Sequence, residues 1–145
     1  MKPDLATRSQ IHNLVVGFYR EVSCDDLLGP VFREVAETDW AAHIPKLIDF
    51  WCRVLLGHPG YEGYVLGAHR DVHEAEPFTP ELFDRWYLLF AASVDESWQG
   101  PIAERAKVHA ARMAKGLAHH LLDLDWQVPE EVVLVDGTPP APTQI

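Results

Sequence analysis

Cysteine is scarce and long apolar runs are absent, and both shortages exclude whole classes of protein. Cys24 and Cys52 are the two cysteines of the 145 residues, too few for a disulfide framework and not in the CxxC spacing of redox or metal motifs. No apolar run approaches the roughly 18 residues that cross a bilayer, and the first residues lack the apolar core of a secretory signal. We therefore expect a single soluble domain in the reducing cytoplasm.

Basic residues are also few. Lys and Arg total 12 against 22 Asp and Glu, which gives a formal net charge of −10. Nucleic acids and anionic membranes bind basic surfaces, so neither is expected as a partner. The acidic excess is concentrated in residues 123–145, which hold five acidic residues, no Lys or Arg, and four prolines. We expect a folded domain over residues 1–122 and an acidic, proline-rich, mobile tail over 123–145.

The familiar catalytic motifs are missing as well. The sequence contains no GxGxxG, no GxxxxGK[ST], no GxSxG and no HExxH, which are the signatures of phosphate-binding loops, nucleophile elbows and zinc-binding helices. Its Asp and Glu residues fall mostly on the exposed phases of the apolar pattern, which disfavours a pair of catalytic carboxylates. No dedicated catalytic motif is therefore identified.

The apolar residues that are present repeat with helical spacing. Leu14, Phe18 and Val22 follow one another at four-residue steps, which predicts an amphipathic helix. A second helix follows, and Pro45 is expected in its first turn because proline has no backbone N–H to donate. This places His43 at or just before the start of the second helix.

Two further helices have clear start signals. Thr79-Pro80-Glu81 combines a capping residue, a proline at the first helical position and an acid in the first turn. Gly100-Pro101 precedes the segment 102–122, which is expected to be the longest helix. No segment alternates with a period of two residues strongly enough to predict a strand. The predicted fold class is all-α.

Three polar-tipped side chains fall on inward faces of three of these helices. Tyr19, His43 and Trp86 are each, taken alone, more often core residues than parts of a site. Together, in a core rich in Phe and Trp, they fit an apolar pocket with a few convergent donors. His69 and His73 lie one helical turn apart. That spacing suits a metal-binding pair, one histidine on an iron with the other nearby, or a solvated face.

Several short segments occur in an order and at a spacing that together are specific. They are FYREV at 18–22, LLGPVF at 27–32, WxxH at 40–43, DFWCRVLLG at 49–57, YxG at 61–63 with a histidine six residues on, and FDRWYLLF at 83–90. On these segments the chain resembles a group III truncated haemoglobin over about residues 8–118. The resemblance implies the truncated globin fold, a two-over-two helical sandwich, around haem b. Because no CxxCH motif is present, non-covalent haem binding is expected.

The resemblance also implies, by position, which side chains surround the haem. Tyr19 corresponds to the distal tyrosine, Trp86 to the distal tryptophan, and His43 to the histidine at the mouth of the distal pocket. The other side chains line the cofactor: Phe32 as the aromatic packed on the haem, Leu47 as a distal wall residue, and Phe50 and Trp51 as an aromatic floor.

Two histidines compete for the iron. Counting 18 residues from Trp51, or six from Gly63, gives His69, whereas counting back from Pro77-Phe78 favours His73. We prefer His69 because the run from residue 50 to residue 69 aligns without gaps. Val65-Leu66 stands where Pro-Met is commoner in the family, which leaves the local path of this segment open.

A globin of this kind is expected to bind dioxygen, nitric oxide or carbon monoxide, and hydroxyl and indole donors stabilise bound dioxygen. Redox activity toward nitric oxide or peroxide stays open and would need an external reductase, since no flavin domain is present. Two alternatives are a cofactor-free helical interaction module and a non-haem metal bundle that uses His43, His69 and His73. Such a bundle needs carboxylates three residues from its histidines. Among these three histidines, His73 alone has a carboxylate at that spacing, Glu76.

Overall fold

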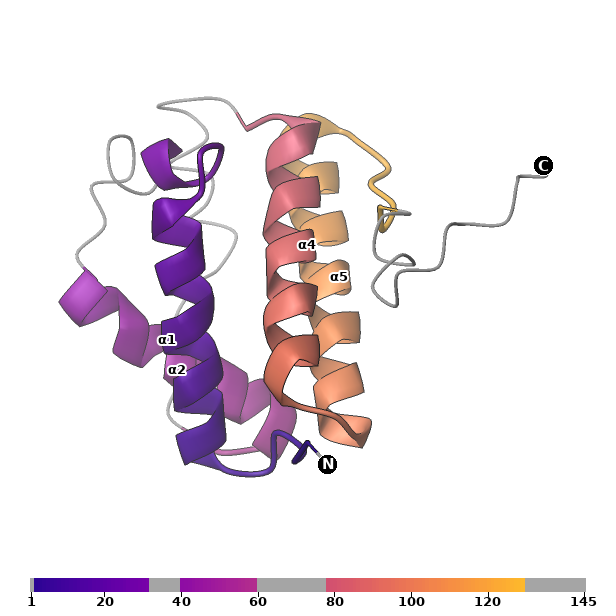
Figure 1. The fold of residues 1–145 in the computed structure, drawn as a ribbon. Helices are drawn as coiled ribbons and strands as arrows, with labels where there is room; N and C mark the ends of the chain where they lie inside the picture. The colour runs from indigo at the N-terminus through magenta and orange to yellow at the C-terminus, as the bar shows by residue number, and fades with distance from the viewer. Residues whose placement is uncertain (1, 32–39, 60–77, 130–145) are drawn as a thin grey trace.

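The computed structural model describes residues 2–31, 40–59 and 78–129, and these ranges contain four long helices and no strand. The helices are α1 (Arg8–Cys24), α2 (Trp40–Leu56), α4 (Pro80–Ser97) and α5 (Pro101–Leu122) (Figure 1). The predicted all-α class is confirmed, and α5 is the longest of the four. In the described part of the chain, no helix combines the length and apolar character needed to cross a membrane.

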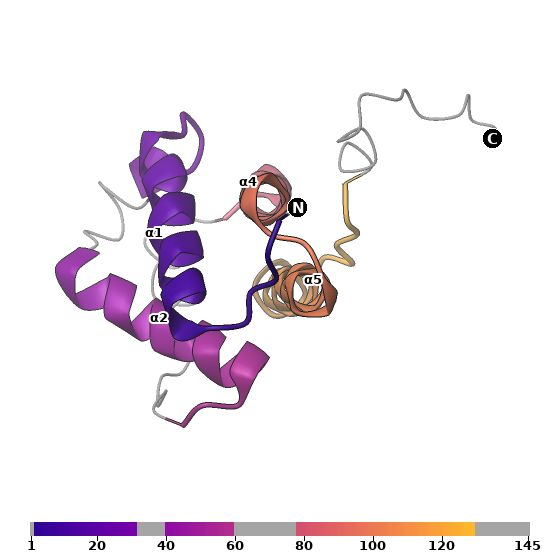
Figure 2. The same cartoon turned by 60° about the horizontal axis from the view of Figure 1, so that its bottom comes forward.

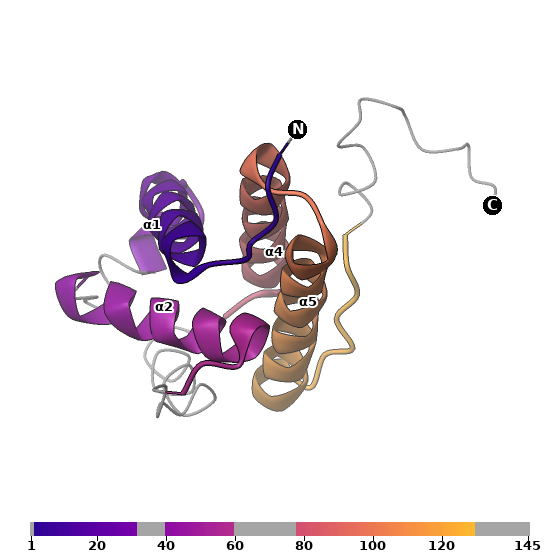
Figure 3. The same ribbon diagram turned by 90° about the horizontal axis from the view of Figure 1, so that it is seen from below.

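The helices pack as two pairs. α1 packs against α2, which runs across it, and α4 lies beside α5 (Figures 1 and 3). Contacts between α1 and α4, and between α2 and α5, join the two pairs around one core. This arrangement is the two-over-two helical sandwich that the sequence resemblance implies, and it brings one face of each of α1, α2 and α4 together.

Helix α1 is defined at its start by a capping box. The backbone N–H of Gln10 donates to the Thr7 hydroxyl (3.2 Å), and the backbone N–H of Thr7 donates to the Gln10 side chain (3.1 Å). These two bonds satisfy donors that a helix start leaves unpaired. The predicted apolar stripe is fully buried in the core: Ile11, Leu14, Val15, Phe18 and Val22.

Helix α2 corrects the expectation for Pro45. The helix begins at Trp40, so Pro45 lies inside it and His43 lies within its first turn rather than before its start. A proline at this position cannot donate to the carbonyl of Ala41, which costs the helix one hydrogen bond. Ala41 and Pro45 are both exposed, so the ring points away from the core. The opposite face holds the segment helical because Ile48, Trp51, Cys52 and Leu55 are buried.

Helices α4 and α5 begin at the prolines that the sequence singled out, Pro80 and Pro101. The residue before α5, Gly100, has no side chain with which to cap it, and the N-terminal segment supplies the cap instead (Figure 2). The Asp4 carboxylate accepts from the backbone N–H of Ile102 (3.0 Å) and of Ala103 (2.7 Å). Gly100 has a φ of 139°, which other residues rarely adopt, and a Cβ there would lie 2.6 Å from Asp4 Cγ. Both the backbone conformation and the lack of space therefore favour glycine at this position.

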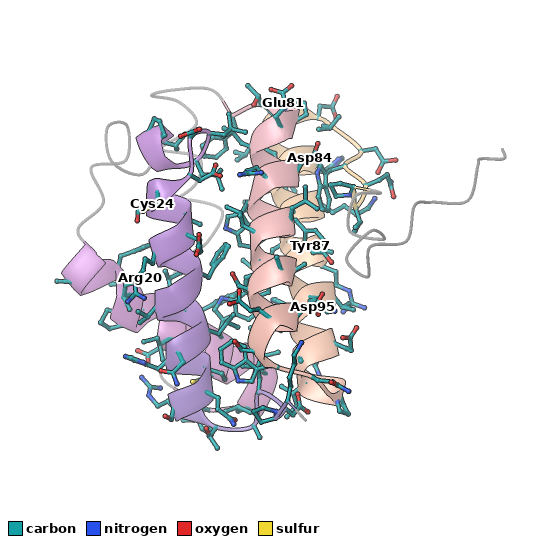
Figure 4. All side chains as sticks on the ribbon, viewed as in Figure 1. Arg20, Cys24, Glu81, Asp84, Tyr87 and Asp95 are labelled. Carbon is teal, nitrogen blue, oxygen red and sulfur yellow. The ribbon has the colours of Figure 1, made fainter. Side chains whose placement is uncertain are left out.

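The packed structure continues beyond the end of α5. The helix ends at Leu122, the expected end of the folded domain, but Trp126 is only 4% exposed. Its indole donates to Asp84 of α4 (2.8 Å), and its ring meets Tyr87 edge-on with centroids 5.8 Å apart. Asp84 and Tyr87 lie on the same side of α4 in Figure 4. The first residues of the expected tail therefore cover α4, while residues 130–145 lie outside the described part.

Candidate functional site

The three polar-tipped side chains predicted to converge lie close together. Tyr19 of α1 is 7% exposed, and the indole N–H of Trp86, on α4, donates a hydrogen bond to its hydroxyl. The half-buried His43 of α2 faces the same tyrosine, with ring centroids 6.1 Å apart and planes at 80°. Three helices thus contribute one hydrogen-bonding side chain each to a single place in the core, which we call the distal trio.

Burial controls the proton on Tyr19. Removal from water disfavours the phenolate and raises the pKa of Tyr19 to about 12, while the hydrogen bond from Trp86 acts in the opposite direction. At neutral pH the hydroxyl is therefore protonated. It accepts from Trp86 through its oxygen, so its own proton is directed toward a different group. The site holds a neutral hydrogen-bond donor in apolar surroundings.

A stack of aromatic rings backs the distal trio. The Trp86 ring stacks on Phe90 (centroids 5.7 Å, planes at 12°), and Phe90 stacks in turn on Trp51 (4.9 Å, 20°). Phe18 meets both Trp86 and Phe90 edge-on, at 5.8 Å and 5.2 Å. Offset and edge-to-face contacts of this kind add to the energy of burial. They pack against the indole of Trp86 and restrict the rotation of its ring.

Of the side chains expected to line a cofactor, the structure describes Leu47, Phe50 and Trp51, all on α2. Trp51 is fully buried, whereas Leu47 and Phe50 are half-buried on α2. The rings of Phe50 and Trp51 touch edge-on at 5.3 Å, as neighbours in one apolar surface. Phe32, His69 and His73 lie outside the described residues. The described ranges hold no group of three or more His, Cys, Asp or Glu residues that could bind a metal ion.

His109 of α5 was not among the predicted site residues. Its half-buried ring lies 5.9 Å from Phe50 and 5.7 Å from Trp51, measured between centroids. Burial, and to a smaller extent the charge of Arg112, lower the pKa of His109. A neutral imidazole therefore packs behind the aromatic pair. Sequence reasoning missed His109 because it has no partner at a metal-ligand spacing. The sequence of α5 also does not show that this residue would contact α2.

The second feature that sequence reasoning missed is an ion pair between α1 and α4. Asp25 is the one buried charged residue in the described part of the chain, and it accepts from Arg85 Nε (2.7 Å) and Nη2 (2.6 Å). The backbone N–H groups of Leu27 (3.1 Å) and Leu28 (3.0 Å) donate to the same carboxylate. Burial alone would raise the pKa of Asp25, but these four donors together lower it. Arg85 is the residue before Trp86.

No family model matches the chain. The group 3 truncated hemoglobin ctb of Campylobacter jejuni is 33% identical over 118 residues, which cover 77% of this chain and 91% of that protein. The crystal structure of the group III truncated hemoglobin from Campylobacter jejuni is similar as a fold, with a TM-score of 0.73 and 30% identity. That match covers 83% of this chain and 95% of the other. By sequence and by fold, the chain belongs to the group III truncated haemoglobins, a family of globin-type haem proteins.

Proposed function

We propose that this protein binds haem b through one axial histidine, His69, and holds dioxygen or another diatomic ligand on the side of the distal trio. The observation that carries the proposal is the convergence of the distal trio: Tyr19 is buried, the ring of His43 faces it at 6.1 Å, and Trp86 is the hydrogen-bond donor that acts on its hydroxyl. Two polar donors meet inside an otherwise aromatic core, and a purely structural core gains nothing from placing donors there that apolar residues could replace. Membership of a haem-protein family supports the same conclusion.

The residues present fit the cofactor. Haem needs a broad apolar surface, and α2 offers Leu47 and Phe50, both half-buried, beside the buried Trp51. When bound, the haem iron supplies a coordination position for a diatomic molecule, and an imidazole is the usual protein ligand on its other side. We assign that imidazole to His69, with His73 as the alternative. Phe32 is assigned to packing against the haem.

The three side chains of the distal trio would have different roles in ligand binding. The Tyr19 hydroxyl donates its proton to a ligand that carries partial negative charge, and the single N–H of Trp86 is shared between the Tyr19 oxygen and the ligand. The two residues therefore act as a connected pair rather than as independent contacts. His43 lies in the first turn of α2, half-buried at the edge of the cluster. We assign it the control of ligand access.

We also propose that the distal trio supports redox reactions of the bound ligand. Donors that stabilise bound dioxygen also polarise its O–O bond, so the distal trio suits oxidation of nitric oxide or reduction of peroxide. Electrons would have to come from an external reductase. Carbon monoxide and nitric oxide would bind as well, with less dependence on the donors because they carry less charge than bound dioxygen.

The test is to purify the protein, load it with haem and pass it through gel filtration. We expect the haem to stay with the protein, a Soret band, and stable complexes with carbon monoxide and dioxygen. Loss of haem on the column would overturn the proposal and favour a cofactor-free interaction module. A chain that loses haem but binds a divalent metal with its histidines would instead favour the non-haem bundle.

A further inference from the structure

Two polar contacts connect α1 with α4. One is the hydrogen bond from Trp86 to Tyr19, and the other is the ion pair of Arg85 with Asp25. They involve consecutive residues of α4. On α1, Tyr19 lies inside the helix, whereas Asp25 is the residue that ends it. In Figure 4 the labelled Cys24, the last residue of α1, lies at a height between the labelled Asp84 and Tyr87 of α4.

Apolar side chains also join α1 and α4 in the described part of the chain. Phe18 lies against Phe90 and the ring of Trp86, and Val22 is fully buried in the same core. Apolar burial depends on the area removed from water and has no preferred direction. Such a contact holds two helices together but permits one to slide or turn slightly against the other. A hydrogen bond between Tyr19 and Trp86 is sensitive to that movement, because hydrogen bonds weaken steeply with distance and misalignment.

The ion pair of Asp25 with Arg85, unlike apolar burial, requires a particular position of α1 relative to α4. The Asp25 side chain is 3% exposed, and Arg85 reaches it with two nitrogens while its own side chain stays 49% exposed. The carboxylate is also fixed from its own side, because Leu27 and Leu28 donate to it. Separating the pair would leave a buried charge without its counter-ion, which is strongly unfavourable. The end of α1 is therefore tied to α4 one residue before Trp86.

We propose that the ion pair of Asp25 and Arg85 is a positioning device: it sets α1 against α4 so that the Tyr19 hydroxyl meets the Trp86 indole, and thereby sets the strength of the distal donors. Arg85 and Asp25 are positioning residues, since they act through Tyr19 and Trp86. The effect on ligand binding rests on the proposed function above, whereas the effect on the hydrogen bond does not.

The test uses Arg85→Gln, which removes the charge, and Arg85→Lys, which keeps it. The first measurement is the indole N–H resonance of Trp86, one of five indole signals, assigned by its loss in Trp86→Phe. It is read in the purified protein, in the diamagnetic carbon monoxide complex where haem is bound. We expect Arg85→Gln to move this resonance toward its position in Tyr19→Phe, and Arg85→Lys to restore most of the wild-type position.

The second measurement is the rate of dioxygen dissociation. Arg85→Gln should raise it about three- to tenfold, equivalent to about 0.6–1.4 kcal/mol. In a Tyr19→Phe background the same substitution should add little, because the contact through which it acts is already gone. The matched control is Asp95→Asn, which breaks the ion pair of Asp95 with Lys107 (2.7 Å) between α4 and α5. It should change neither the Trp86 resonance nor the dissociation rate.

The outcomes separate the two proposals. If Arg85→Gln lowers the melting temperature but leaves both measurements unchanged, the ion pair is only structural and the inference is wrong. If the protein fails to bind haem, the proposed function is wrong, but the Trp86 resonance still tests the geometry. If Arg85→Gln does not fold, Asp25→Asn combined with Arg85→Gln removes both charges together, and the same comparison is made with that variant.

Discussion

The Trp86 indole acts as a hydrogen-bond donor to the Tyr19 hydroxyl, and this contact opposes the effect of burial on the tyrosine pKa. A hydrogen bond to a charged acceptor contributes about 1.5–3 kcal/mol. We therefore expect Tyr19→Phe to raise the dioxygen dissociation rate about ten- to a hundredfold, and Trp86→Phe to act in the same direction. Because the residues are coupled, the double variant should show less than the sum of the two effects. Stopped-flow kinetics measure all three. An unchanged rate in Tyr19→Phe would contradict the distal assignment.

Alkaline pH should leave the Tyr19 donor intact over a wide range. The pKa of Tyr19 is raised to about 12, above its value of about 10 in an unfolded chain. The stability that the neutral tyrosine contributes is thus fully present below about pH 10 and is lost as the pH rises through 12. Between about pH 7 and 10, the dioxygen dissociation rate should therefore stay flat in the wild type. A rise in that range that is absent from Tyr19→Phe would contradict the raised pKa.

The axial ligand can be identified by substitution. His69→Ala should lose most of its haem or the spectrum of a histidine-ligated iron, whereas His73→Ala should keep both. Absorption and resonance Raman spectra of the ferrous protein make the comparison. The opposite pattern would assign the iron to His73 and shift the segment by one helical turn, without affecting membership of the family.

His43 should affect ligand access more than ligand retention. It lies half-buried in the first turn of α2, with its ring toward Tyr19, so His43→Ala opens the edge of the distal trio. We expect faster carbon monoxide association with a smaller change in dioxygen dissociation. If dissociation changes as much as in Tyr19→Phe, His43 is a third donor to the ligand and not a gate.

Acid should destabilise the fold partly through His109. Its folded-state pKa is lowered from 6.5, so below that pH the unfolded chain binds a proton that the folded protein resists, and stability falls with falling pH. His109→Phe keeps an aromatic ring against Phe50 and Trp51 but cannot take up the proton. Its free energy of unfolding should decline less between about pH 7 and 5 than that of the wild type. Chemical denaturation at several pH values tests this, and parallel declines would exclude His109 as a source.

The order of the helices and the starts of α4 and α5 could be predicted well because their signals are local. Thr79-Pro80 and Gly100-Pro101 mark helix starts in the sequence itself, and the structure begins α4 and α5 at those prolines. Pro45 shows where local signals fail. The buried face of α2 extends the helix ahead of the proline, since packing outweighs the loss of one hydrogen bond. Trp126 is a similar case, because acidic and proline-rich composition does not reveal one buried indole.

Pairings between distant residues could not be predicted in the same way. Helical periodicity indicated that Tyr19 and Trp86 face inward, but it carries no information on which residue of another helix each one meets. The ion pair of Asp25 and Arg85 joins residues 60 positions apart, and neither stands out in the sequence among its charged neighbours. Such contacts depend on how the helices cross, which is a property of the packed core.

The cap of α5 has a consequence for how the chain is made. Asp4 and Ile102, which it caps, are 98 residues apart, so the carboxylate leaves the ribosome long before the helix that needs it. The cap of α5 can therefore form only after nearly the whole domain has been synthesised. Contacts so distant in sequence are slow to form. The N-terminal segment and the start of α5 therefore become ordered together. Removing residues before Arg8 would leave the start of α5 without its cap and impair the folding of that helix.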